Sequence, residues 1–177
     1  MGSHSEGGRV SSGSADEGGA LVRRPLDPQR LLVAVADREA GANVLFVGTA
    51  RAATGGRPTV ALEYEAHEAM AGPAIERLCR LAVEKFGLVA CAVEHRLGRV
   101  PVGEASVAVA TSAPHRREAF AAAEWLMERI KREAPIWKCE ERPDGRREWI
   151  HPGGDPSKPE PAARGPRPAD RPRGRRR

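Results

Sequence analysis

Two helical segments, each followed by two apolar segments of strand character, constrain the fold of this chain most strongly. The first helix is expected over Met70 to Phe86, where apolar residues recur at three- and four-residue spacing and Gly87 follows as a C-terminal cap. The second is expected to begin at Ser112 and to end at Pro135, because proline cannot continue a helix. Strand pairs that alternate with helices favour an α+β fold with a mainly antiparallel sheet.

The remaining elements follow from local signals. Asp27 can cap a short helix that has Pro28 at its first position and runs to about Arg38. Asp144 and Gly145 form a good hairpin turn between the last two expected strands. The strands are expected at residues 42–49, 59–67, 89–97, 105–111, 136–141 and 147–150. The loop RAATGGRP after the first strand contains two glycines and a proline, and we expect no regular structure there.

Both ends of the chain differ in composition from its middle. Residues 1–24 are rich in glycine and serine, and residues 151–177 are rich in proline and arginine, so we expect two disordered segments around one folded domain at 25–150. The last segment holds eight Lys or Arg against three Asp or Glu, which accounts for the entire net charge of +5. The domain is therefore neutral, and its sum of charges does not argue for a nucleic-acid-binding face. The tail could contact RNA or an acidic surface, but a solvated end is the simpler interpretation, and we do not expect nucleic-acid binding.

Cysteine usage and hydropathy indicate a cytoplasmic protein. Cys79, Cys91 and Cys139 are odd in number and lack CxxC spacing, which fits a reducing compartment better than a disulfide framework. No apolar run reaches the roughly 18 residues that a membrane span needs, and no signal-peptide core follows the N-terminus.

The second helix carries cations on the face that its apolar pattern turns inward. At about 100° per residue, Lys131 falls within this face beside Phe120, and Arg116 falls near its centre. Cations on an inward face are costly unless they meet an anion. The apolar pattern itself consists of Phe120, Ala123, Met127, Ile130 and Ala134.

Lys131 and Lys138 stand on either side of Pro135 and can converge on one pocket at a helix-to-strand corner. Lysine does chemistry when its environment lowers its pKa or when it stabilises an oxyanion, so the pair is a candidate catalytic site. The alternative is that Lys131 extends its stem over apolar surface and that Lys138 is an ordinary strand lysine facing water.

Further candidates surround this pair. Arg51 follows a buried strand in a glycine-bearing loop, where a guanidinium can bind phosphate, although it could equally be a solvated loop residue. His115 and Arg116 accompany the start of the second helix, where backbone N–H groups can bind an anion, although an ordinary capped helix with two solvated basic residues is the simpler interpretation. Cys139 is better interpreted as a buried thiol than as a nucleophile, because neighbouring strand residues point to opposite faces. His67 and His95 lack partners at metal-ligand spacing, and we expect no metal.

The spacing along the second helix bears on assembly. Arg116 and Lys131 are fifteen residues apart, which on a straight helix is about 22 Å. A small phosphorylated ligand does not easily bridge that distance within one chain. If both residues serve the same kind of site, a two-fold dimer in which each chain contributes one end is the simplest arrangement.

Four stretches together resemble the large, catalytic subunits of molybdopterin synthase. They are GANVLFVGTAR, ALEYEAHEAMA, VEHRLGRVPVGEASVAVATSAPHRREAF and IKREAPIWKCE, and the likeness extends over roughly Leu31 to Ile150. The combination of SAPHR with KxxxPxWK is the most specific part. The resemblance implies an α/β hammerhead fold, a homodimer, and a small ubiquitin-like sulfur carrier bound at each end of that dimer.

The resemblance also implies a reaction and a set of site residues. The carrier's C-terminal thiocarboxylate would donate sulfur to cyclic pyranopterin monophosphate to make the dithiolene of molybdopterin, a sulfurtransferase reaction without a cofactor. The family's functional positions correspond here to Arg51, His115, Arg116, Lys131 and Lys138. An arginine before the last tryptophan would join them, and we take Arg147 for this role with Arg146 as the competing choice. Two other functions stay open at this point, a non-catalytic binding module that uses the basic tail and a small phosphate-ester enzyme that uses the same cationic pocket.

Overall fold

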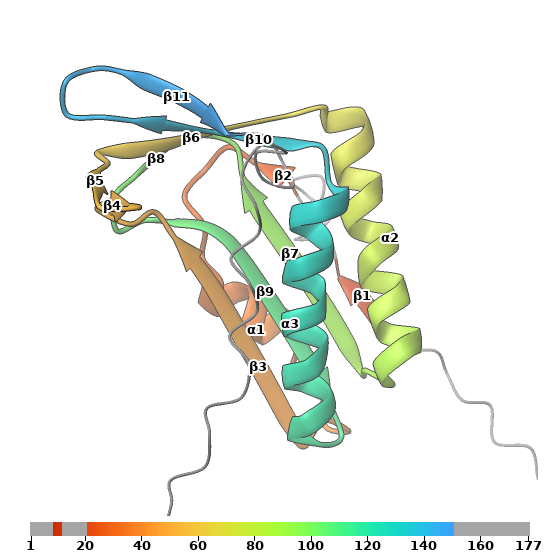
Figure 1. Ribbon diagram of the computed structural model, residues 1–177. Helices are drawn as coiled ribbons and strands as arrows, with labels where there is room; N and C mark the ends of the chain where they lie inside the picture. Colours follow the sequence, from red (N-terminus) through yellow and green to blue (C-terminus); the bar gives the residue numbers. More distant parts are fainter. Residues whose placement is uncertain (1–8, 12–20, 151–177) are drawn as a thin grey trace, which may run out of the picture.

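The computed structural model describes residues 9–11 and 21–150, and every structural statement below concerns these residues. Three helices pack on the two faces of a central sheet: α1 (Pro28–Val35) lies on one face, and α2 (Glu68–Phe86) and α3 (Arg116–Glu133) lie side by side on the other (Figure 1). This arrangement confirms the α+β class. Most of the expected N-terminal extension and the entire C-terminal tail fall outside the described residues.

The central sheet combines antiparallel and parallel pairing. Its middle strands β7 (Ala90–Arg96) and β9 (Ala105–Ala113) are antiparallel, and β3 (Ala42–Thr49) continues the antiparallel order on the far side of β9. Two short strands, β1 (Arg9–Ser11) and β2 (Leu21–Val22), pair with β7 in parallel. The packed structure therefore already includes Leu21 and Val22, which the sequence analysis assigned to the N-terminal extension.

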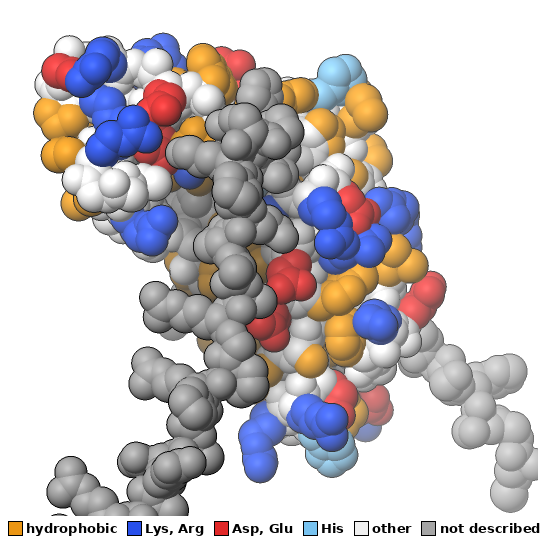
Figure 2. Space-filling model, viewed as in Figure 1, with side chains coloured by type: hydrophobic (Ala, Val, Ile, Leu, Met, Phe, Trp, Pro, Cys, Tyr) orange, Lys and Arg blue, Asp and Glu red, His pale blue; other side chains and the backbone are white. Residues whose placement is uncertain are grey.

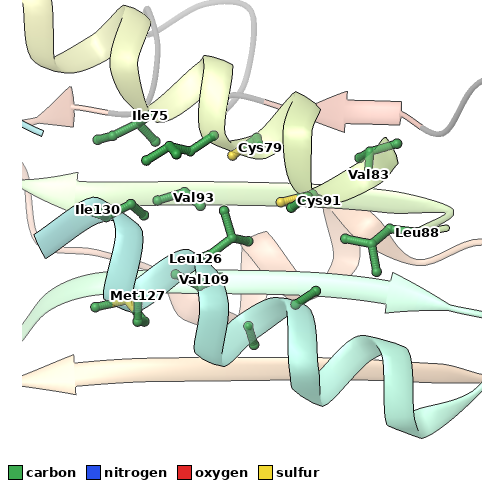
Figure 3. Close-up of a cluster of buried hydrophobic side chains, with 14 of the residues drawn as sticks. Ile75, Cys79, Val83, Leu88, Cys91, Val93, Val109, Leu126, Met127 and Ile130 are labelled. Atoms are coloured by element: carbon green, nitrogen blue, oxygen red, sulfur yellow. The ribbon is translucent and has the colours of Figure 1, made fainter. Parts of the chain in front are cut away.

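The alternation of side chains along β7 and β9 explains why both strands read as nearly continuous apolar runs. Cys91 and Val93 point to α2 and α3 and join the larger core, whose members Figure 3 shows between the two helices and the sheet. Ala90 and Ala92 point to the opposite face, where they pack with Leu31 of α1. A strand that is covered on both faces needs apolar residues at every position, so the usual apolar–polar alternation disappears.

A second sheet lies across one end of the first, at the end where α3 stops (Figure 1). All of its pairings are antiparallel, in the order β11-β10-β6-β8. Its strands are β6 (Ala61–Ala66), β8 (Gly98–Pro101), β10 (Ile136–Glu141) and β11 (Arg147–Ile150). The last two form the hairpin expected around Asp144 and Gly145, and β8 is a short strand that the sequence analysis did not predict.

The loop after β3 contains a small hairpin, so the expectation of no regular structure there was wrong. Strands β4 (Ala53–Thr54) and β5 (Arg57–Pro58) pair antiparallel. Gly55 and Gly56 connect them with φ values of 57° and 77°. Two successive residues at positive φ suit a tight two-residue hairpin turn, and glycine adopts them without steric cost. The two glycines thus build the structure that they were expected to prevent.

Helix α3 begins later and faces differently than the sequence suggested. Ser112 does not cap the helix, because it is buried in β9, where its hydroxyl donates to the Ala90 carbonyl oxygen at 3.4 Å. Phe120 is 63% exposed instead of buried, and Arg116 is exposed as well. The face that packs on the sheet is centred on Ala119, Ala122, Ala123, Leu126, Met127 and Ile130. Small alanine side chains let the helix approach the sheet closely, and a pattern search weighted to large apolar residues overlooks them.

Other local signals were read correctly. Asp27 caps α1, since its Oδ1 accepts hydrogen bonds from the backbone N–H groups of Gln29 and Arg30 at 3.1 and 3.2 Å. Gly87 ends α2 in the left-handed conformation at φ 62°. None of the helices in the described part of the chain is long and apolar enough to cross a membrane.

Candidate functional site

A cavity of about 520 Å³ opens where the central sheet and the C-terminal end of α3 meet the second sheet. Its walls come from β3, α3, β6, β7, β9, β10 and β11, together with the loop region that follows β3. Elements that are far apart in the sequence therefore contribute to one space. The floor is apolar and the rim carries charge, a combination typical of small-molecule sites.

The structure brings three of the sequence-predicted residues to this cavity. Lys131 lies in the last turn of α3, Lys138 lies in β10, and Arg51 follows β3 in the loop before β4; all three line the cavity. Pro135 ends the helical segment and turns the chain into β10, which is why the two lysines meet across a corner. Lys131 and Arg51 are exposed, whereas the Lys138 side chain is only 32% exposed. Three cations around one cavity favour an anionic ligand.

A buried carboxylate stands behind Lys138. The Lys138 ammonium donates to Oε1 of Glu140 at 3.2 Å, and the Glu140 side chain is fully buried. Oε2 of Glu140 lies 2.7 Å from Nη2 of Arg142, so the carboxylate sits between two cations. A buried carboxylate is tolerated when such partners compensate its lost hydration. The sequence analysis did not single out Glu140 or Arg142, although charges at two of the alternating inward positions could have indicated the pair.

A neutral polar wall faces the same cavity. His95 of β7 and Tyr64 of β6 meet edge to face with ring centres 4.8 Å apart. The Tyr64 hydroxyl donates to Ser106 Oγ at 3.4 Å, and Ser106 in turn donates to the Gly48 carbonyl oxygen at 3.2 Å. Sequence reasoning considered His95 only as a metal ligand. The position of His95, an inward-facing histidine in a mostly apolar strand, could have indicated a buried polar group at the cavity.

Burial determines how the two rings of this wall are protonated. It lowers the pKa of His95 to about 4, opposed by the hydrogen bond between His95 Nδ1 and the Arg96 carbonyl oxygen at 3.0 Å. The carbonyl oxygen can only accept, so Nδ1 carries the proton and Nε2 is left as an acceptor. Burial also raises the pKa of Tyr64. At neutral pH the wall is therefore uncharged, in contrast to the cationic rim.

His115 and Arg116 lie at the other end of α3 and do not line the cavity. Both are exposed, and His115 occupies the N-cap position without a side-chain capping hydrogen bond. Figure 2 shows basic side chains beside the β10–β11 hairpin and where α3 begins, with further basic side chains over the helices between these two ends. Within one chain, these two residues are thus not brought together with the lysine corner.

Arg146 and Arg147 also lie away from the lysine cavity. Arg147 of β11 forms an ion pair with Glu63 of β6, and Arg146 binds Asp144 Oδ2 in the hairpin turn at 2.6 Å. Both line a second cavity at the hairpin. The geometry of a single chain therefore does not distinguish between them as a site residue.

The cysteines are free and buried, Cys139 included, as the sequence analysis expected for that residue. Among the described residues, no group of three or more His, Cys, Asp or Glu side chains is arranged to hold a metal ion. The side chains that line the cavity include lysine and arginine cations and the neutral hydrogen-bonding groups of Tyr64, His95 and Ser106.

Comparison with known proteins gives consistent results. The family model described as MoaE protein matches residues 21–133. A molybdopterin synthase catalytic subunit of Emericella nidulans is 44% identical over 129 residues, which is 73% of this chain and 66% of that protein. A protein of the same description from Bacillus subtilis is 42% identical over 130 residues, 73% of this chain and 82% of the relative.

Solved structures agree with the sequence comparisons. Molybdopterin synthase from Staphylococcus aureus superimposes with a TM-score of 0.69 at 34% identity, covering 73% of this chain and 94% of that one. A chain from a protein–protein complex of subunits 1 and 2 of molybdopterin-converting factor from Helicobacter pylori has a TM-score of 0.59 at 26% identity, covering 74% and 87%.

Proposed function

The chain belongs to the MoaE protein family, which comprises the catalytic subunits of molybdopterin synthase in molybdenum cofactor biosynthesis, and from this premise we propose how its cavity works. The substrate is cyclic pyranopterin monophosphate, and the sulfur donor is the C-terminal thiocarboxylate of a small ubiquitin-like carrier protein. Two rounds of sulfur transfer yield the dithiolene of molybdopterin. The complex of two subunits known from Helicobacter pylori supports a partner of this kind.

The observation that carries this proposal is the convergence of Arg51, Lys131 and Lys138 on one cavity. The thiocarboxylate and the substrate phosphate are both anions, so the cationic rim draws them to the same place. A degenerate binding module would have no reason to keep both lysines at the cavity. The observation therefore favours catalysis over simple binding.

The cationic groups have distinct tasks in this mechanism. The thiocarboxylate sulfur attacks a side-chain carbon of the pterin and forms a C–S bond there while a C–O bond of that carbon breaks. The departing oxygen keeps the electron pair of the broken bond and leaves as a phosphate oxygen or, once protonated, as water. The carrier is then joined to the substrate through an acyl–sulfur bond. Water then attacks the acyl carbon, and the electron pair of the C=O bond moves to oxygen to give a tetrahedral oxyanion. An ammonium group close to that oxygen stabilises it, and the oxyanion collapses to expel the sulfur, which remains on the pterin while the carrier leaves as a carboxylate. Lys131 and Lys138 are the groups placed for this step and for the associated proton transfer.

Substrate orientation falls to the remaining basic residues. Arg51 binds the phosphate at the rim of the cavity with its planar guanidinium. His115 and Arg116 act in the site of a second chain, since about 22 Å of helix separates Arg116 from Lys131. Arg147, with Arg146 as the alternative, would reach the substrate only after giving up its present ion pair.

Reconstitution tests the proposal directly. Purified chain, thiocarboxylated carrier and pyranopterin substrate are combined, and molybdopterin formation is compared for wild type, Lys131→Ala and Lys138→Ala. We expect each variant to lose at least about a hundredfold in rate, as for the loss of a single oxyanion-stabilising group. Arg38→Ala, on the loop after α1, serves as a matched control for removal of a basic side chain outside the cavity. Unchanged product formation in both lysine variants would rule out this assignment of the site.

A further inference from the structure

Arg142, which follows β10 in the hairpin, is only 8% exposed although it carries a charge. One half of its guanidinium binds the segment that includes β5. Nη1 donates to the carbonyl oxygens of Arg57 and Pro58 at 3.3 and 3.1 Å and to Thr59 Oγ1 at 3.0 Å. This segment belongs to the loop region that starts at Arg51.

The other half of the guanidinium meets two carboxylates. Nη2 lies 2.7 Å from Glu140 Oε2 and donates to Glu148 Oε2 at 3.2 Å. Glu140 is the fully buried carboxylate whose other oxygen accepts from Lys138. Arg142 therefore does not contact Lys138 directly. Among the contacts of the described residues, Glu140 is the only residue that contacts both.

We propose that Arg142 is a positioning residue for Lys138: it fixes and neutralises Glu140, so that this carboxylate orients the lysine toward the cavity without capturing it. The inference rests on the proposed function, because it assigns Lys138 a role in the reaction. It extends that function to a residue that does not line the lysine cavity.

The two oxygens of the Glu140 carboxylate contact different cations, Lys138 and Arg142, and this sharing explains the role of Arg142. If Arg142 is removed, Lys138 is the only remaining cation in contact with a fully buried carboxylate. A buried charge holds its single partner more strongly than a charge that is shared. The Lys138 ammonium would then be drawn toward Glu140 and away from the acyl oxygen that it must stabilise. Catalytic groups tolerate little misplacement, so the rate suffers although Lys138 is still present.

Lysine cannot replace Arg142 fully. The guanidinium presents five N–H donors in a rigid plane. Here it donates to three oxygens of the β5 segment and to Glu148, and it forms an ion pair with Glu140. An ammonium at this position would keep the charge but reach only part of these oxygens. Arg142→Lys should therefore behave as an intermediate between wild type and Arg142→Gln.

A double-mutant cycle in the full chain tests the proposal. The variants are Arg142→Gln, Glu140→Gln, the combination of both, and Arg142→Lys. Arg99→Gln is the matched control, because Arg99 forms an exposed pair with Glu141 on the same sheet at 3.0 Å. Single-turnover rates are measured at saturating carrier and substrate, per folded chain, alongside the KM for the carrier and a thermal melt.

We expect Arg142→Gln to lower the single-turnover rate about tenfold or more while the KM for the carrier stays within about twofold of wild type. In the Glu140→Gln background the same substitution should change the rate little, because the carboxylate that it neutralises is gone. Additive effects in the cycle, or an Arg142→Lys variant equal to the Arg99→Gln control, would overturn the proposal. If Arg142→Gln does not fold, Arg142→Lys takes its place in the cycle with the same criterion.

A second measurement does not depend on activity. Competitive acetylation followed by mass spectrometry compares the labelling of Lys138 with that of Lys131 in the same molecule. We expect Arg142→Gln to slow Lys138 labelling at least about threefold relative to Lys131, because Glu140 then holds the ammonium alone, and Arg99→Gln to leave the ratio unchanged. An unchanged ratio in Arg142→Gln refutes the inference about Arg142. A wild-type chain that makes no molybdopterin refutes the proposed function instead, so the two failures are distinguishable.

Discussion

At the scale of single residues, the cavity separates charged groups from neutral ones. Lys138 is held at the rim by a carboxylate, whereas His95 lies in the wall at 7% exposure. Both side chains can carry a proton, yet burial keeps the imidazole neutral, because a charged ring would lose its hydration without gaining an anionic partner. A neutral acceptor next to a cationic rim suits a ligand that presents N–H groups beside its negative charge.

The buried state of His95 predicts a pH dependence of stability. Its pKa falls from 6.5 to about 4 in the folded chain. The unfolded chain therefore binds more protons between these values, and the free energy of unfolding decreases as the pH falls through this window. We expect the free energy of unfolding of the wild type to fall between pH 7 and pH 4 by about 3 kcal/mol more than that of a His95→Asn variant. Asparagine keeps a donor for the Arg96 carbonyl.

Urea unfolding at a series of pH values measures this difference. The carboxylates titrate in the same range in both proteins, so the comparison depends on the difference between the two curves and not on either curve alone. Parallel curves for wild type and variant would show that His95 titrates normally in the folded chain.

At the scale of elements, α2 contains one glycine and is followed by another, and the two have different backbone conformations. Gly72 lies inside the helix directly before Pro73, whereas Gly87 ends it at φ 62°, and apart from the neighbouring residues in the chain an added Cβ would meet nothing within 4 Å at either position. We expect Gly72→Ala to leave the free energy of unfolding within about 0.5 kcal/mol of wild type, because the helix preference of alanine is opposed by the clash of its Cβ with the Pro73 ring. Gly87→Ala should lower it by about 1–2 kcal/mol, because the left-handed conformation is strained for alanine.

Denaturant unfolding of both variants at one pH checks this difference. Each substitution adds the same methyl group, which apart from the neighbouring residues in the chain meets nothing within 4 Å, so the pair compares two backbone conformations. A loss of stability in Gly72→Ala as large as that in Gly87→Ala would contradict the assigned conformations.

The elements also show what could be predicted from the sequence and what could not. The order of helices and long strands followed from apolar periodicity, and Asp27 and Gly87 marked ends that local chemistry determines. The rotation of α3 did not follow, because its packing face is built from alanines such as Ala119, whose burial depends on how closely the sheet approaches. The pairing of Glu140 with Arg142 was hidden for a similar reason, since it depends on which strand face the hairpin turns inward.

At the scale of the whole molecule, α3 connects two sites of positive charge. Lys131 lies at the cavity in the C-terminal turn of α3, and His115 and Arg116 lie at the N-terminal end of the same helix. Figure 1 shows these two ends of α3 at opposite ends of the molecule. If His115, Arg116 and Lys131 bind the same substrate molecule, they cannot all come from one chain. Helix α3 is packed along its length on the sheet and cannot bend to bring its two ends together. A two-fold dimer solves this geometrically, since each site then takes the helix start from one chain and the lysine corner from the other.

Mixed dimers test this shared arrangement. Arg116→Ala and Lys131→Ala chains are inactive alone under this hypothesis, because each site lacks one group. When the chains are denatured together and refolded, random pairing makes half of the dimers mixed, and each mixed dimer holds one intact site out of two. We expect the mixture to recover about a quarter of the wild-type rate. Molybdopterin formation and the dimer content by sedimentation are measured on the same samples, and refolded single variants serve as controls. A mixture that contains mixed dimers and stays inactive would show that each chain completes its site alone.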